Sequence, residues 1–395
     1  MATAGRIVVV GAGLAGLRTV ERLRRRGHEG PVTLAGAEPH RPYDRPPLSK
    51  ALLAGDGTPE PVPLRTSPYE DLGIDLRTGV RATALDTAAK QVALDGGEAL
   101  PYDRLVIATG VRPRTIPAIA GPGVHVLRTF EDCLALRAGL RAARHVTVIG
   151  GGVLGCEIAA AARARGVEVA LVEALDAPLA RVLGPPAAAA VADLHRSNDV
   201  RLHCPARVES ADNGRVMLST GEAIATDLIV VAVGAVPDTA WLEGSGVLLD
   251  DGVVCDRTGR TSAPDVFAVG DVARMPHPYR ERTVRLEHWT SAGDTAALVA
   301  GNLLAPPDGQ KELAEVPYFW SDQYGVKIQC LGLPDPADEL TVAAGSPESG
   351  SWLGLYSDAG GRLTGAVAFG MPAALARTRR PIAARAPLSE MMERS

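Results

Sequence analysis

A proline-rich stretch at 38–50 holds the cationic side chains of this sequence that are best placed to do chemistry. It contains four prolines together with Arg41, Arg45 and Lys50. Because proline fixes φ and lacks an N–H group, the stretch is predicted to be a stiff loop. A stiff loop holds its cations at fixed positions, where they can contact a bound ligand. The alternative is a surface loop with solvated charges. The elements around the loop decide between the two.

The segment before this loop reads as strand, glycine loop, helix, strand and acid. An apolar strand at 7–10 leads into G-x-G-x-x-G at 11–16, a helix is predicted up to Arg26, and a strand at 32–35 leads to Glu38. The first glycine permits a tight turn, the second lets a pyrophosphate approach the backbone, and the third lets the helix pack closely. These glycines are Gly11, Gly13 and Gly16. The order predicts a dinucleotide site in which Glu38 binds a ribose hydroxyl.

The same unit occurs a second time, about 140 residues later. A strand at 145–149 is followed by a glycine loop at 150–155, a helix through Arg165 and a strand at 167–172 that ends at Glu173. One unit supplies one pyrophosphate site, so two units predict two dinucleotides. A glutamate at this position accepts from a 2′-hydroxyl and repels a 2′-phosphate, which favours NAD over NADP.

Three further runs are predicted to complete the two domains. The run at 102–110 is an apolar strand that ends in small residues, including Thr109, where backbone must pass close to a bulky group. A strand is predicted at 228–237, and the run at 261–271 ends in Gly-Asp, with Asp271 aimed at a cofactor's polar chain. The last run is expected to return the chain to the first domain.

The C-terminal part of the sequence differs in composition. Aromatic residues, which are only 4% of the chain, gather at 317–324 around Trp320. Alternating runs at 327–331 and 352–356 predict strands of a small antiparallel sheet. A helix is expected from Met371, with a frayed end after Pro387.

Composition excludes several classes of function. The chain has 395 residues, 46% of them hydrophobic and 22% charged, which indicates a globular protein of two or three domains. A net charge of −5 gives no sign of nucleic-acid binding. Five dispersed cysteines without a Cys-x-x-Cys motif predict reduced thiols and no metal site. No leader or long apolar run is evident, so a soluble, cytoplasmic protein without a membrane segment is expected. Arginines 141, 144, 163 and 165 are expected to be solvated.

Taken together, these motifs match a known family. Over nearly its whole length the sequence resembles the FAD-containing NADH:ferredoxin reductases of bacterial oxygenase systems, of the putidaredoxin-reductase and biphenyl-dioxygenase-reductase type. The two most specific motifs are the run that ends at Lys50 and the run around Trp320. The others are Gly11–Gly16, Ala108–Gly110, Leu127–Thr129, Gly150–Glu157, Gly270-Asp271 and Glu287–Trp289.

The resemblance implies an α/β fold with two Rossmann-like domains in a glutathione-reductase-like arrangement and a small α+β C-terminal domain. The expected domains are FAD-binding at 1–112 and 250–316, NAD-binding at 113–249, and a C-terminal interface domain at 317–395. Besides Gly11 and Gly16, the expected FAD contacts are Gly13, Ala15, Glu38, Arg45, Lys50, Ala82, Thr109, Arg128, Asp271 and Trp289. Besides Gly155, the expected NADH contacts are Gly150, Gly152, Val153, Glu173 and Gly234, with Glu287 near the nicotinamide. Ala37 stands where many relatives carry a carboxylate, which leaves Glu38 as the ribose acceptor.

The resemblance also implies a mechanism. Hydride passes from NADH to the flavin N5 atom, and single electrons then pass to an iron–sulfur ferredoxin, expected to be of the two-iron type, near Trp320. Lys50 and Glu157 resemble the family's pair beside N5, where Lys50 would supply positive charge. The ferredoxin would feed a haem mono-oxygenase or a Rieske dioxygenase. The sequence does not distinguish a monomer from a homodimer.

Two other functions remain open at this point. One is a rubredoxin reductase or an NADH oxidase, and the other is a non-catalytic NAD- and FAD-binding redox sensor. Individual residues also have ordinary alternatives: Glu157 as a solvated helix-start acid, Trp320 as core of the small sheet, and His288 as a structural histidine.

Overall fold

The computed structural model describes residues 5–212 and 214–393, which form two compact units. Unit 1 contains Met1–Asp44, Pro61–Arg112 and Val236–Pro317, and unit 2 contains Arg45–Glu60, Pro113–Ala235 and Tyr318–Ser395. The division falls inside the proline-rich loop, between Asp44 and Arg45. Glu38 and Lys50 therefore belong to different units.

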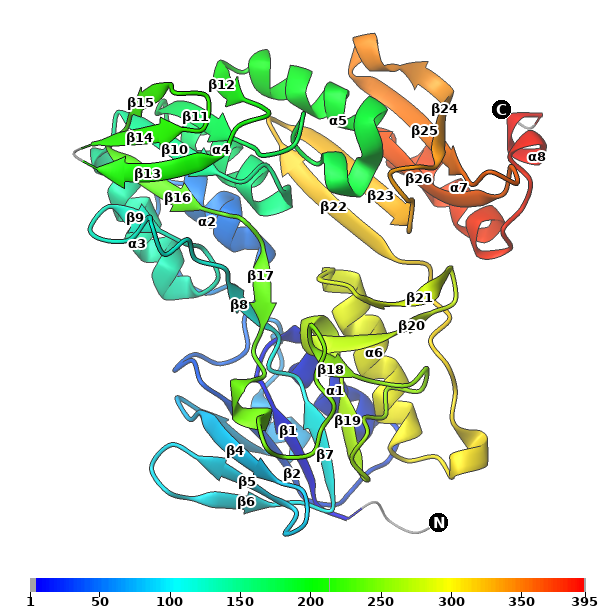
Figure 1. Ribbon diagram of the computed structural model, residues 1–395. Helices are drawn as coiled ribbons and strands as arrows, with labels where there is room; N and C mark the ends of the chain where they lie inside the picture. The colour runs from blue at the N-terminus through cyan, green and yellow to red at the C-terminus, as the bar shows by residue number, and fades with distance from the viewer. Residues whose placement is uncertain (1–4, 213, 394–395) are drawn as a thin grey trace. The chain divides into compact units, whose positions relative to one another are not determined.

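The core of unit 1 is a five-stranded parallel sheet in the order β19-β7-β1-β2-β3 (Figure 1). Strand β1 (Ile7–Val10) is apolar at every position because both faces of a central parallel strand are covered. Ile7 and Val9 join the core that contains helices α1 (Leu14–Arg25) and α6 (Trp289–Asn302), whereas Val8 and Val10 join the core on the other face. This sheet places the first glycine turn at the carboxyl end of β1.

The other elements of unit 1 follow in chain order. Besides β1 they are α1 (Leu14–Arg25), β2 (Val32–Gly36), η2 (Tyr69–Leu72), β3 (Asp75–Thr78), β4 (Ala82–Asp86), β5 (Gln91–Leu94), β6 (Ala99–Pro101), β7 (Arg104–Ile107), η3 (Ala240–Leu242), β18 (Val253–Val254), β19 (Val266–Ala268), η4 (Gly270–Val272), β20 (Ala273–His277), β21 (Arg280–Arg285), α6 (Trp289–Asn302) and η5 (Pro307–Gly309). Strands β8 (Val111–Pro113) and β17 (Ala235–Pro237) pair at the points where the chain passes from one unit to the other.

Unit 2 contains a second five-stranded parallel sheet, in the order β12-β11-β10-β16-β9. Its elements are η1 (Pro46–Ser49), α2 (Ala51–Ala54), β9 (Val124–His125), α3 (Phe130–Ala142), β10 (His145–Ile149), α4 (Val153–Ala164), β11 (Glu168–Val172), α5 (Ala180–Arg196), β12 (Val200–His203), β13 (Val208–Asp212), β14 (Arg215–Leu218), β15 (Ala223–Ala225) and β16 (Leu228–Val231). The second predicted dinucleotide unit is thus a second Rossmann-like sheet.

Unit 2 also contains an antiparallel sheet in the order β22-β23-β26-β25-β24, drawn in yellow to red (Figure 1). Its elements are β22 (Tyr318–Gln323), β23 (Val326–Gly332), β24 (Glu339–Ser346), η6 (Pro347–Ser349), β25 (Ser351–Ser357), β26 (Leu363–Phe369), α7 (Pro372–Ala383) and α8 (Leu388–Met392). The predicted fold class, two Rossmann-like sheets with a small α+β C-terminal part, is confirmed.

Two local predictions are wrong. The run at 228–237 is not one strand, because the chain bends between β16 and β17 at Gly234, whose φ of +99° lies outside the β region. The segment after Pro387 is not frayed in the part that the structure describes, because Leu388–Met392 forms a short helix. Proline is readily accepted just before a helix, so Pro387 starts an element instead of ending one.

Candidate functional site

The two glycine turns have nearly the same construction, one in each unit. Gly11 has φ +114°, and a Cβ there would lie 2.1 Å from the carbonyl oxygen of Ala108. Gly150 has φ +105°, and a Cβ there would lie 2.4 Å from the carbonyl oxygen of Ala232. At Gly16 and Gly155 a Cβ would lie 1.9 Å from the carbonyl oxygen of the first glycine of the same loop. Only glycine fits these positions, so each loop is a strand-to-helix turn at minimum size.

The middle glycine of each turn faces open space instead. Gly13 and Gly152 are the N-caps of α1 and α4, and neither helix start has a side-chain cap or an acid in its first turn. A Cβ at either glycine would meet no atom within 4 Å. Uncapped N–H groups at a helix start, with room in front of them, form a site for an anion such as a pyrophosphate. The residues of both turns therefore fit a dinucleotide.

The acid that follows each unit is held in a different way. The Glu173 carboxylate accepts from the N–H of Gly151 at 2.7 Å and from the N–H of Leu175 at 2.8 Å, so it is fixed at the rim of its own glycine turn. The Glu38 carboxylate accepts from the hydroxyl of Tyr43 at 2.5 Å. Tyr43 is buried and belongs to the proline-rich loop, so this loop orients the predicted ribose acceptor of unit 1.

Lys50 and Glu157 form an ion pair inside unit 2. The Lys50 Nζ lies 2.7 Å from Glu157 Oε2, and the two side chains are 21% and 4% exposed. Glu157 also accepts from Ser49 Oγ at 2.5 Å and from Ser321 Oγ at 2.9 Å. A carboxylate buried among three donors is not a solvated helix-start acid, which excludes that alternative. The Lys50 ammonium is therefore held in place by Glu157 while its side chain remains partly accessible.

Five hydrogen bonds within unit 2 fix the backbone around Lys50. Cys133 Sγ on α3 donates to the carbonyl of Leu48 at 3.3 Å. Arg137 on α3 is buried and donates to the carbonyls of Leu52, at 2.7 Å, and Gly57. The Arg165 guanidinium donates to the carbonyls of Ala54 and Gly55, each at 3.1 Å. Arg165 is only 11% exposed, so its prediction as a solvated arginine is wrong. The loop is held by helix side chains as well as by its prolines.

Trp320 lies on β22, one residue before Ser321. Its ring stacks on that of Tyr318, with centroids 6.0 Å apart and an interplanar angle of 19°. Trp320 is half-buried, whereas Phe319 and Ser321 on either side of it are buried. The strand therefore directs Trp320 to the face opposite Glu157, where part of the indole remains accessible.

The predicted site residues are divided between the two units. Unit 1 contains Gly11, Gly13, Ala15, Gly16, Glu38, Ala82, Thr109, Asp271, Glu287 and Trp289, and unit 2 contains Arg45, Lys50, Arg128, Gly150, Gly152, Val153, Gly155, Glu157, Glu173, Gly234 and Trp320. Each unit thus carries one complete glycine turn with its acid.

Several of these residues contact one another or their neighbours within a unit. In unit 2, Arg45 donates to the carbonyl oxygen of Arg128. In unit 1, the Trp289 indole donates to Asp44 Oδ1 at 2.7 Å, and Glu287 pairs with Arg285 at 2.5 Å. Sequence reasoning missed Ser49, Arg137 and Ser321, since no local pattern distinguishes a buried polar side chain from a solvated one.

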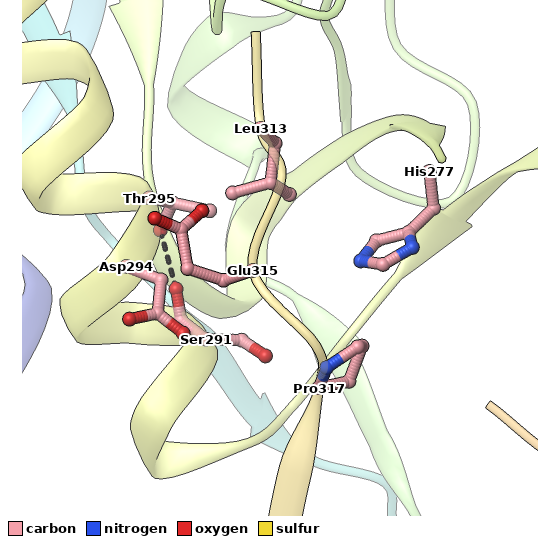
Figure 2. Close-up of a pocket in the computed structure, with 7 residues that line it drawn as sticks. All are labelled: His277, Ser291, Asp294, Thr295, Leu313, Glu315 and Pro317. Atoms are coloured by element: carbon pink, nitrogen blue, oxygen red, sulfur yellow. Dashed lines mark hydrogen bonds between the residues drawn. The ribbon is translucent and has the colours of Figure 1, made fainter. Parts of the chain in front are cut away.

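A small hollow in unit 1 is bordered by His277, Ser291, Thr295 and Leu313 (Figure 2). Thr295 Oγ1 donates to the Ser291 carbonyl at 2.8 Å beside it. The hollow has room for about one water molecule, so it cannot hold a nucleotide. Burial, reinforced by nearby His288, lowers the pKa of His277 to about 4, so this imidazole is neutral near pH 7.

The five cysteines are all free thiols. Burial raises the pKa of Cys133 and Cys204 to about 11 and that of Cys255 and Cys330 to about 12, and it also raises the pKa of Cys156. These thiols are therefore protonated near neutral pH and poor nucleophiles. Across residues 5–212 and 214–393, no group of His, Cys, Asp or Glu has an arrangement suited to a metal ion. None of the helices described there could cross a membrane.

Two open glycine turns, each on a parallel sheet and each followed by an acid, define a protein built to bind two dinucleotides. Comparison with known proteins shows which family of dinucleotide-binding proteins the chain belongs to. Residues 5–296 match the pyridine nucleotide-disulphide oxidoreductase family, and residues 318–392 match a reductase C-terminal domain. The chain belongs to the pyridine nucleotide-disulphide oxidoreductase family.

The similar proteins match almost end to end. The ferredoxin–NAD(+) reductase component of an anthranilate 1,2-dioxygenase system from Burkholderia cepacia is 38% identical, over 95% of this chain and 94% of that protein. Rhodocoxin reductase from Rhodococcus erythropolis is 36% identical, over 97% and 90%. The solved covalent complex of putidaredoxin reductase with putidaredoxin contains a chain that is 32% identical, with a TM-score of 0.92 over 99% of this chain and 98% of that one.

Proposed function

We propose that this protein is an FAD-dependent NADH:ferredoxin oxidoreductase that serves an oxygenase. The observation that carries the proposal is the duplicated glycine turn, open at Gly13 and at Gly152, in a chain that also holds the Lys50–Glu157 pair. Relatives that match nearly the whole chain are named as ferredoxin reductases of dioxygenase systems. The terminal enzyme would be a haem mono-oxygenase or a Rieske dioxygenase.

The glycine turn of unit 1 is assigned to FAD, and the glycine turn of the Rossmann-like sheet of unit 2 is assigned to NADH. The FAD contacts of this proposal are Gly11, Gly13, Ala15, Gly16, Glu38, Arg45, Lys50, Ala82, Thr109, Arg128, Asp271 and Trp289. The NADH contacts are Gly150, Gly152, Val153, Gly155, Glu173, Gly234 and Glu287. In each case the uncapped helix start would hold the pyrophosphate, because its N–H groups favour negative charge.

When bound, the flavin supplies the redox chemistry, taking hydride from NADH and giving up single electrons. The chain supplies orientation and charge. Lys50 carries a fixed positive charge toward the site where negative charge develops. Glu157 holds the Lys50 ammonium and offsets part of its charge, and the hydroxyls of Ser49 and Ser321 fix the position of Glu157. Trp320 lies on the side where an iron–sulfur partner takes electrons.

Glu173 gives the preference for NADH. Its carboxylate is already fixed by the two N–H groups of Gly151 and Leu175 at the rim of the turn. A fixed carboxylate accepts from a ribose 2′-hydroxyl without further ordering, and it repels a 2′-phosphate. Ala174 and Asp176 beside it offer no cation to a phosphate.

The partner is an iron–sulfur ferredoxin, for which the two-iron type remains a prediction. Reduction of a disulphide substrate requires a reactive thiol. All five cysteines are free, and burial raises the pKa of each, so they are protonated near neutral pH and poor nucleophiles. The thiols therefore argue against a disulphide substrate. Free, dispersed thiols also fit the cytoplasm. A rubredoxin reductase or an NADH oxidase is the remaining enzymatic alternative.

The test is NADH-driven reduction of cytochrome c, with and without a candidate two-iron ferredoxin. We expect reduction to depend on the ferredoxin. Equal rates with and without it, together with rapid oxygen consumption, would favour an NADH oxidase.

Trp320→Ala tests the partner side of this assignment. It is expected to slow electron transfer to the ferredoxin by about tenfold, the loss typical of one aromatic interface residue, and to leave flavin reduction by NADH nearly unchanged. Equal slowing of both half-reactions would count against a partner-side role.

A further inference from the structure

Strand β22 carries two buried polar side chains whose purpose the proposed function does not explain. Along Tyr318–Gln323 half-buried and buried positions alternate, and the buried face carries Phe319, Ser321 and Gln323. Ser321 is 0% exposed and Gln323 is 1% exposed. A polar group buried in a core is unfavourable unless it is hydrogen-bonded, so the hydrogen bonds of these two residues show what they do.

The hydrogen bonds of Ser321 run in one direction, toward Glu157. Gln323 Nε2 donates to Ser321 Oγ at 3.0 Å, and Ser321 Oγ donates to Glu157 Oε1 at 2.9 Å. A hydroxyl has a single proton. Because Gln323 donates to the Ser321 oxygen, the Ser321 proton is directed at the carboxylate. The polar face of β22 is thus organised around Glu157 on α4.

The two oxygens of Glu157 are held from two different parts of unit 2. Oε2 receives Ser49 Oγ at 2.5 Å and Lys50 Nζ at 2.7 Å, both from the proline-rich loop. Oε1 receives Ser321 from the C-terminal sheet. With Ser321 removed, the donors that remain all lie on one side, and the carboxylate is free to turn about its side-chain torsions.

We propose that Ser321 is a positioning residue for Lys50, acting through the Glu157 carboxylate. This inference rests on the proposed function and extends it to a residue outside the proposed FAD and NADH contacts. Lys50 is a point charge on a flexible four-carbon stem, so its position depends on the anion that holds it. The strand that carries Trp320 thereby also fixes the charge proposed to assist flavin reduction.

The first test measures the freedom of Lys50 directly, without turnover. The purified FAD-bound protein is treated with an acetylating reagent, and modification of each lysine is followed by peptide mass spectrometry. Ser321→Ala is expected to speed acetylation of Lys50 by about threefold, within the range of couplings inside one hydrogen-bond network. Lys90, Lys311 and Lys327 serve as internal references and should not change. An unchanged Lys50 rate would overturn the proposal.

The control is Ser357→Ala, which removes a buried hydroxyl from β25 of the same sheet. It should leave acetylation of Lys50 at the wild-type rate. If Ser321→Ala does not fold, Ser321→Cys keeps a weaker donor in place and is expected to shift the Lys50 rate in the same direction by a smaller factor. A wild-type Lys50 rate in folded Ser321→Cys would also count against the proposal.

The second test is a double-mutant cycle on flavin reduction at saturating NADH. Ser321→Ala should slow reduction by about tenfold, the rate equivalent of weakening one hydrogen bond to a charged group, with the NADH dissociation constant unchanged. In a Lys50→Gln background the same substitution should have no further effect. A full tenfold loss in that background would show that Ser321 does not act through Lys50. Failure of NADH to reduce the wild-type flavin would instead refute the proposed function, while the acetylation result still tests Ser321.

Discussion

The two glycine turns are built alike, but the segments that follow their acids are not. After Glu173 the chain returns to its own turn, and the Leu179 N–H donates to the Gly151 carbonyl at 2.8 Å. After Glu38 the chain leaves unit 1 at Asp44 and enters unit 2 at Arg45. The segment after Glu173 therefore stays beside its own glycine turn. The segment after Glu38 instead continues into the proline-rich loop that ends at Lys50. The glycine turns, which are repeated in the two units, are suited to binding a dinucleotide. The proline-rich loop, which follows only the first turn, carries the candidate catalytic charge of Lys50.

The largest effect is expected when the same negative charge is placed in both glycine turns. Gly13→Asp and Gly152→Asp each put a carboxylate where a pyrophosphate is proposed. Two like charges about 4 Å apart at an effective dielectric of about 20 repel by about 4 kcal/mol, equivalent to about a thousandfold in affinity. Gly13→Asp should lose FAD, as measured by flavin content, whereas Gly152→Asp should keep FAD and weaken NADH binding.

The matched controls are Gly13→Ala and Gly152→Ala. A methyl group at either position meets no protein atom within 4 Å, so both variants should fold with a small loss of nucleotide affinity. If both Asp variants lost only FAD or only NADH, the assignment of one dinucleotide to each unit would be wrong.

The next prediction concerns the positive charge of Lys50 at the end of the proline-rich loop, which has no counterpart after the second glycine turn. Lys50→Gln removes it while leaving both glycine turns intact. Flavin reduction by NADH should slow by about a hundredfold, comparable to the loss of one group that stabilises developing charge. FAD content should change far less, because the other proposed FAD contacts remain. Lys90→Gln, which removes a lysine paired with Asp265 in unit 1, is the control. A rate within twofold of wild type would exclude Lys50 from the chemistry.

The acids test whether the two turns hold different nucleotides. Glu173→Arg should shift preference toward NADPH by about tenfold or more, equivalent to about 1.4 kcal/mol, because a cation replaces a hydroxyl acceptor. The matched variant Glu38→Arg should weaken FAD retention and leave the ratio of NADH to NADPH activity unchanged. Unaltered selectivity in Glu173→Arg would refute the placement of Glu173 beside the ribose.

The smallest effect is expected from a variant that tests how Glu38 is held, compared with Glu173. Tyr43→Phe removes the hydroxyl that donates to Glu38 and leaves the ring that packs in the loop. FAD affinity, measured by fluorescence titration of the apoprotein, should fall by about fivefold, equivalent to about 1 kcal/mol for one hydrogen bond. NADH affinity should not change, because Glu173 is held by the backbone N–H groups of Gly151 and Leu175 and not by Tyr43.

The parts of the fold that can be predicted from sequence are those determined by the steric requirements of individual residues. Gly11 and Gly16 could not carry a Cβ without overlapping backbone, so their spacing reports the turn directly. The strands before each turn are apolar throughout because parallel strands are covered on both faces. The Lys50–Glu157 pair was anticipated from the family resemblance, and the two groups lie 2.7 Å apart.

The parts that could not be predicted depend on contacts between residues far apart in the chain. Nothing near Arg137 indicates that it is buried against the carbonyls of Leu52 and Gly57, since an arginine on a helix is most often solvated. The same is true of Ser321, which meets Glu157 across 164 positions of sequence. That the proline-rich loop changes units at Arg45 also follows from such contacts alone.

In the proposed function, NADH bound at the second glycine turn donates electrons to FAD bound at the first. The most direct measurement is anaerobic stopped-flow mixing of the purified FAD-bound protein with NADH, followed by the visible absorbance of the flavin. The proposed function predicts rapid bleaching at a rate that saturates with NADH, with slower bleaching by NADPH. Flavin absorbance that stays unchanged with saturating NADH would contradict it.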